Sequence, residues 1–162
     1  SGFPVGYLRV IQALSDGRPE MAQAMRADLR LVADAKDDTR WFTHGLGLGL
    51  VDLALGDGEA LRRAVAAGAA TRDAYGRRLE LVCAAAAAPA SAPVLAALPW
   101  VTERAALALV ADALRAEMAG DRQAARDAWR AFTALPTRER MLDGHLPYVD
   151  LELTAAWRAN AP

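Results

Sequence analysis

One short pattern recurs three times along this chain: an apolar helical stretch ends at a glycine beside an aspartate, and a second helical stretch starts within three residues. The copies lie at residues 13–17, 53–57 and 117–121. Glycine readily takes the left-handed conformation that ends a helix, so each copy predicts a turn between two antiparallel helices. One helical hairpin alone cannot cover its apolar face, and neighbouring hairpins must do so. The sequence therefore predicts an all-α fold of stacked antiparallel helical hairpins.

The spacing of apolar residues predicts helix along nearly the whole chain. Apolar residues recur three or four positions apart, and β-branched residues are sparse. The most amphipathic stretch has an apolar face containing Ala125, Ala128, Trp129, Phe132 and Leu135, opposite a polar face with Arg122, Arg126 and Arg130. The expected helices span residues 5–14, 19–33, 40–55, 59–75, 77–88, 94–98, 99–119, 121–135 and 147–159.

Three of these expected helices carry features that bear on packing. The second has an apolar stripe of Met21, Met25, Leu29 and Val32, and the last should dock Val149, Leu153, Ala156 and Trp157. Residues 45–50 alternate glycine with leucine, which is a period typical of a strand. We still expect helix there, because Leu48 and Leu55 continue the helical spacing and no neighbouring segment reads as a pairing strand.

Length and composition indicate one domain. The chain has 162 residues, of which 54% are hydrophobic, and alanine supplies most of the excess. This composition favours closely packed helices over a membrane span. We expect a single helical domain over residues 1–162, with a candidate hinge at the proline- and alanine-rich residues 89–93. The opening Ser1-Gly2 in place of Met is what a cloning remnant or a segment cut from a longer protein would show.

The charge balance argues against nucleic acid as a direct partner. Nineteen basic and twenty acidic residues give a net charge of −1, so the basic footprint that phosphate backbones require is missing. All the basic residues except Lys36 are arginine, which together with the alanine content is typical of a GC-rich bacterial genome. The single Cys83 excludes an internal disulfide and fits a reducing compartment. We expect a soluble cytoplasmic protein with no membrane partner.

The second and third hairpins resemble the tetratricopeptide repeat. The matching residues are Leu48, Gly49 and Gly56 in one hairpin, and Ala113, Gly120, Ala125, Trp129 and Pro136 in the other. The two turn glycines are 64 residues apart, which is not a multiple of that family's repeat of about 34 residues. The resemblance covers about half the chain and implies a right-handed array of hairpins. The residues themselves leave an irregular helical bundle as the alternative.

The resemblance also implies candidate partner-binding residues, because peptide-binding members of that family face a concave groove with the first helix of each hairpin. The corresponding residues here are Thr43, Leu46, Leu50, Leu53, Leu107, Val110, Leu114 and Met118. Their mostly apolar character argues against a clamp for peptide carboxylate termini. Two interpretations follow: the groove is filled and these residues are core, or an apolar groove receives a partner helix.

The residue sets that enzyme chemistry needs are missing from the sequence. Cys83, His44 and His145 stand at no motif spacing that would pair a nucleophile with a base. Zinc would need paired cysteines or a His-Glu-x-x-His segment, and the chain has neither. We therefore expect no enzyme activity, no metal and no cofactor.

The leading hypothesis is an interaction or scaffolding module of a bacterial regulatory or signalling protein, with another protein or a peptide helix as its partner. One alternative is a stand-alone binder that neutralises a toxin or acts as a chaperone. Another is a helical enzyme or small-molecule receptor, whose apolar pocket would be lined by Trp41, His44 and Tyr75.

Overall fold

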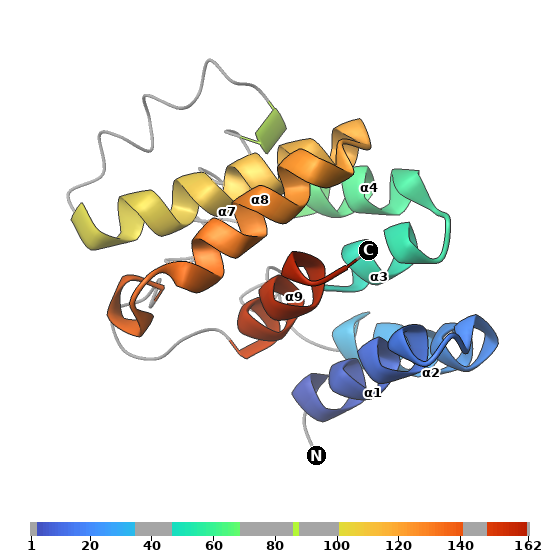
Figure 1. Cartoon of the computed structure of the whole chain (residues 1–162). Coiled ribbons are helices and arrows are strands. Elements are labelled where there is room, and N and C mark those ends of the chain that lie inside the picture. The colour runs from blue at the N-terminus through green and yellow to red at the C-terminus, as the bar shows by residue number, and fades with distance from the viewer. Residues whose placement is uncertain (1–2, 35–46, 69–85, 88–100, 141–148, 162) are drawn as a thin grey trace.

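The computed structural model describes residues 3–34, 47–68, 86–87, 101–140 and 149–161. Within these ranges the backbone is helical and contains no strand, which confirms the predicted all-α fold (Figure 1). The elements with assigned bounds are α1 (Phe3–Ser15), α2 (Pro19–Asp34), α3 (Gly47–Ala54), α4 (Gly58–Gly68), α7 (Val101–Ala119), α8 (Arg122–Ala134), the 3-10 helix η4 (Thr137–Glu139) and α9 (Val149–Ala159). Helix α3 shows that residues 47–50 form helix and not strand. The candidate hinge at residues 89–93 lies outside the described ranges.

The three predicted turns share one hydrogen-bond pattern. Gly17, Gly56 and Gly120 have φ angles of 69°, 97° and 75°, which lie in the left-handed region. At the third turn, the Gly120 amide donates to the Glu117 carbonyl and the Asp121 amide to the Ala116 carbonyl, at 3.1 and 3.0 Å. The other two turns repeat both bonds at equivalent positions. This is the Schellman motif, which satisfies the last carbonyls of a helix while the chain reverses.

An aspartate follows two of these glycines and starts the next helix. Asp57 Oδ1 accepts a hydrogen bond from the Ala60 amide at 3.1 Å, and Asp121 Oδ1 accepts one from the Ala124 amide at 3.0 Å. A side-chain oxygen in this position satisfies a free amide in the first turn of a helix. The Gly-Asp pairs of the sequence therefore end one helix and begin the next. The hairpins α1–α2, α3–α4 and α7–α8 are the result.

Most of the core lies along the α7–α8 hairpin. Trp129 and Phe132 of α8 are completely buried, with ring centroids 6.3 Å apart and ring planes at 88°. Edge-to-face contact of this kind contributes about 1 kcal/mol beyond the buried area. The cluster also contains Leu61 and Val65 of α4 and Ala155 of α9. The apolar face predicted for α8 is confirmed, with Ala125, Trp129 and Phe132 buried.

A second cluster joins the first hairpin to the rest of the molecule. It contains Tyr7, Val10, Ile11, Ala13, Ala22 and Val51, from α1, α2 and α3. The predicted stripe of α2 is wrong at its first position, because Met21 is 42% exposed whereas its neighbour Ala22 is buried. The inward face of α2 passes through Ala22 and Arg26, four residues apart, and Arg26 pairs with a carboxylate of α3.

Helix α9 lies between the α1–α2 hairpin and α8 (Figure 1) and also contacts α3. The Tyr7 hydroxyl of α1 and Thr154 Oγ1 of α9 form a buried hydrogen bond of 2.7 Å. Trp157 packs against both core clusters. Of the docking face predicted for α9, Leu153 and Trp157 pack against the core. Ala156 is exposed and its neighbour Ala155 is buried in its place. The last described helix thus connects the first hairpin to the third.

Candidate functional site

An open cleft of about 810 Å³ lies where the C-terminal ends of α1, α3, α7 and α9 meet the first turns of α8. Each of the three hairpins contributes to the lining, and α9 closes one side. Ile11, Leu14, Ser15, Leu53, Ala54, Glu117, Gly120, Arg122, Ala125, Arg126, Trp157, Arg158, Asn160 and Ala161 line it. A volume of this size falls within the range of protein pockets that bind ligands.

A buried ion pair holds one side of the cleft. Arg158 of α9 donates from Nε and Nη2 to the two carboxylate oxygens of Glu117, both at 2.6 Å. The Trp129 Nε1 donates to the same carboxylate at 3.2 Å. The Glu117 side chain is only 3% exposed, so its charge depends on these partners for stabilisation. Glu117 and Arg158 therefore neutralise each other and fix α9 against α7.

The apolar part of the lining comes from three helices. Ile11 and Leu14 of α1 face the cleft together with Leu53 of α3 and Trp157 of α9. The Arg158 guanidinium lies 5.1 Å from the centroid of the Trp157 ring, which is a cation–π distance. Because Arg158 also holds Glu117, the indole is anchored beside the ion pair. The cleft thus offers a fixed aromatic and aliphatic surface.

The polar part of the lining carries an excess of positive charge. Its described charged residues are Arg122, Arg126 and Arg158 against the single carboxylate of Glu117, and Arg158 is already paired. Among the described residues, neither Arg122 nor Arg126 makes an ion pair, and the Nε of Arg126 is buried without a hydrogen-bond partner. These two arginines are four residues apart on α8, where like charges repel. Their guanidinium groups line the cleft without an acceptor among the described residues.

The helix ends around the cleft do not use these two guanidinium groups. The carbonyls that end α1, α3 and α7 accept bonds within their Schellman turns, and Arg130 Nε donates to the Ala159 carbonyl at the end of α9 at 3.0 Å. A cation near a helix C-terminus is favourable, so the Arg130 guanidinium is stabilised by the end of α9. Arg122 and Arg126 have no such acceptor within the described residues.

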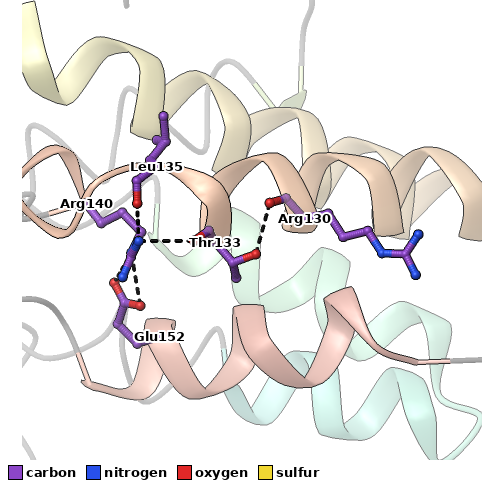
Figure 2. Close-up of polar contacts among 5 residues, drawn as sticks. All are labelled: Arg130, Thr133, Leu135, Arg140 and Glu152. Atoms are coloured by element: carbon purple, nitrogen blue, oxygen red, sulfur yellow. Dashed lines mark hydrogen bonds and ion pairs between the residues drawn. The ribbon is translucent and has the colours of Figure 1, made fainter.

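A second arginine contact fixes the other end of α9 (Figure 2). Arg140 Nε donates to both carboxylate oxygens of Glu152, at 2.9 and 3.1 Å. Its Nη1 donates to the carbonyls of Thr133 and Leu135 at the end of α8. One side chain therefore caps α8 and ties α9 to it. With Glu117–Arg158 near the opposite end, both ends of α9 are held, and the wall that carries Trp157 is set in place.

Most of the expected partner-binding residues that the structure describes lie in the core. Leu50, Leu107, Val110 and Leu114 are at most 1% exposed, and Met118 is half-buried against the same cluster. These buried side chains are not free to contact a partner. Of the expected partner-binding residues that the structure describes, Leu53 alone lines the cleft. Thr43 and Leu46 lie outside the described residues, as do Trp41, His44 and Tyr75 of the pocket alternative.

The charged residues that shape the site were not anticipated. Glu117 follows the stripe of Val110 and Leu114 on α7, and Asp52 continues the apolar spacing of α3. A carboxylate on an apolar face signals a buried partner, but spacing along the chain does not identify it. The partners are Arg158 for Glu117 and Arg26 for Asp52, 41 and 26 residues away. In the part of the chain that the structure describes, no group of three or more metal-ligating side chains lies together.

None of the helices in the described ranges is long and apolar enough to cross a membrane. In comparisons with protein-family models, curated proteins and solved structures, nothing matches this chain. The tetratricopeptide arrangement therefore stays a prediction that rests on the residues quoted for it.

Proposed function

We propose that this chain is a protein interaction module that binds a segment of another protein in the cleft between α1, α3, α8 and α9. The observation that carries the proposal is the lining itself. It combines an anchored apolar surface around Trp157 with the guanidinium groups of Arg122 and Arg126, which form no ion pair with any described residue. Arginine and tryptophan are the residues in which binding energy concentrates at protein interfaces. Helical hairpins supply a rigid frame for such a surface.

The lining supports binding over catalysis. Among the described lining residues Ser15 carries the one hydroxyl, and its Oγ donates to the Ile11 carbonyl at 2.9 Å. A serine nucleophile needs a base in contact with it, and the described part of the lining holds no imidazole and, apart from the paired Glu117, no carboxylate. From the sequence, we propose that the module belongs to a bacterial regulatory or signalling protein. A free-standing binder of a toxin would use the same cleft.

A cleft-filling substitution tests the proposal. Ala54 is exposed at the end of α3 and lines the cleft, so Ala54→Trp should fill it without disturbing the core. Ala131→Trp is the matched control, because Ala131 is exposed on α8 outside the lining. In affinity capture from the source cells followed by mass spectrometry, we expect the wild-type and Ala131→Trp proteins to retain the same partner and Ala54→Trp to lose it.

The identity of the captured protein distinguishes the two settings, since a regulator would retain a subunit of its own assembly and a toxin binder would retain a toxin. Equal recovery by all three proteins would place the partner elsewhere on the surface. Recovery of nothing by the wild type would also contradict the interaction role.

A further inference from the structure

The arginines of the cleft differ in whether their hydrogen-bonding edges are already used. Arg158 donates from Nε and Nη2 to Glu117. Just outside the lining, Arg130 donates from Nε to the Ala159 carbonyl. The Nε of Arg126 is buried and has no partner among the described residues. A guanidinium can bind a carboxylate through two parallel hydrogen bonds. Arg126 lines the cleft, and its terminal Nη groups are the donors that an anion there can reach.

Arg122 and Arg126 stand four residues apart on α8, and like charges at this spacing repel each other. An anion bound between the two side chains would offset this repulsion. No carboxylate of the described chain does so: Asp121 accepts from the Ala124 amide and Asp127 from Gln123 Nε2.

The apolar surface beside these arginines restricts what the anion is attached to. Leu14, Leu53 and Trp157 line the same cleft, so the bound group must place apolar atoms next to its negative charge. An aspartate or glutamate beside a large apolar residue in a protein segment meets both requirements. A polyanion such as nucleic acid would leave the apolar surface uncovered.

We propose that the cleft recognises an acidic residue of the partner segment through Arg126 and Arg122, while a neighbouring apolar side chain of that segment packs on Leu14, Leu53 and Trp157. This inference rests on the proposed interaction function and names the chemistry of the partner. It predicts a preference for acidic-apolar sequences that weakens with salt.

The test uses a displayed library of random twelve-residue peptides selected on the intact chain. We expect the selected peptides to contain Asp or Glu next to Leu, Ile, Phe or Trp. A selected peptide is then synthesised with its acidic residue and with the corresponding amide. The amide version should bind about tenfold more weakly or worse, which is the contribution expected of a charge-assisted hydrogen bond.

Substitutions in the chain locate the effect. Arg126→Gln should weaken the acidic peptide by a similar factor and should leave the amide peptide nearly unaffected, which shows that the two groups interact with each other. Arg138→Gln is the matched control, because Arg138 is exposed on η4 and is not in the lining. Circular dichroism melting of each variant checks that the fold is retained.

The outcomes separate the two proposals. Neutral or basic peptides that lose binding in Ala54→Trp would overturn the acidic preference and leave the interaction function standing. Acidic peptides whose affinity does not change in Arg126→Gln would overturn the assignment of Arg126. Phosphopeptides or free fatty acids that bind Arg126 more tightly than the acidic peptides would overturn the choice of ligand. If every selected peptide binds the Ala54→Trp protein as tightly as the wild type, the proposed function fails as well.

Discussion

Two carboxylates of this protein, Asp52 and Glu117, are almost completely removed from water, and each pairs with an arginine of another helical unit. Taking a charge out of water is costly, and a buried pair repays that cost only with good geometry and further hydrogen bonds. Glu117 meets both conditions through the two-pronged contact with Arg158 and the bond from Trp129. Such a pair fixes how α7 and α9 meet more than it adds to stability.

Removing the Glu117 carboxylate should therefore destabilise the protein strongly. Glu117→Ala leaves Arg158 and the Trp129 indole without their acceptor, and we expect the free energy of unfolding to fall by about 3 kcal/mol or more. Glu59→Ala serves as the control, since Glu59 pairs with Arg62 at 3.4 Å on the surface and is 71% exposed. That change should cost less than about 0.5 kcal/mol. Urea denaturation measures both, and similar losses would mean that Glu117 is not buried.

At the scale of the elements, a turn builds each hairpin, and three arginines donate to carbonyls at the ends of helices. The Arg62 Nη2 donates to the Met118 carbonyl at 2.7 Å, Arg130 caps α9, and Arg140 caps α8. Neither α7 nor α8 has a basic residue in its own last turn. The carbonyls left free at a helix end need partners, and here other elements supply them. The arginines that cap these helix ends therefore also hold neighbouring elements together.

Replacing a turn glycine tests the hairpin geometry. A Cβ at Gly120 would meet nothing within 4 Å, so Gly120→Ala is opposed by the left-handed backbone alone, and we expect a loss of about 1 to 2 kcal/mol. Gly58→Ala is the control, because Gly58 begins α4 and its Cβ would lie at an ordinary 3.9 Å from Leu53 Cδ1. The control should be neutral or stabilising by up to about 1 kcal/mol. Thermal melts that show equal effects would contradict the turn assignment.

At the scale of the whole molecule, local features were predictable from the sequence and distant pairings were not. The Gly-Asp turns and the apolar face of α8 depend on residues a few positions apart, which periodicity and capping rules read directly. The position of α9 depends on Tyr7 meeting Thr154, 147 residues away, and on Glu117 meeting Arg158. The cleft is made by those contacts, so among its described lining residues only Leu53 was an expected partner-binding residue. The family resemblance pointed to the inner face of α7, which the core occupies.

We propose that α9 and the three hairpin ends together form one binding surface. Amide hydrogen exchange, recorded with and without a selected acidic peptide, tests it most directly because it reports every segment at once. We predict slower exchange on binding at residues 11–15, 53–54, 117–126 and 157–161, which belong to all four sides of the cleft. Protection confined to α2 and α4, with those four segments unchanged, would contradict the claim.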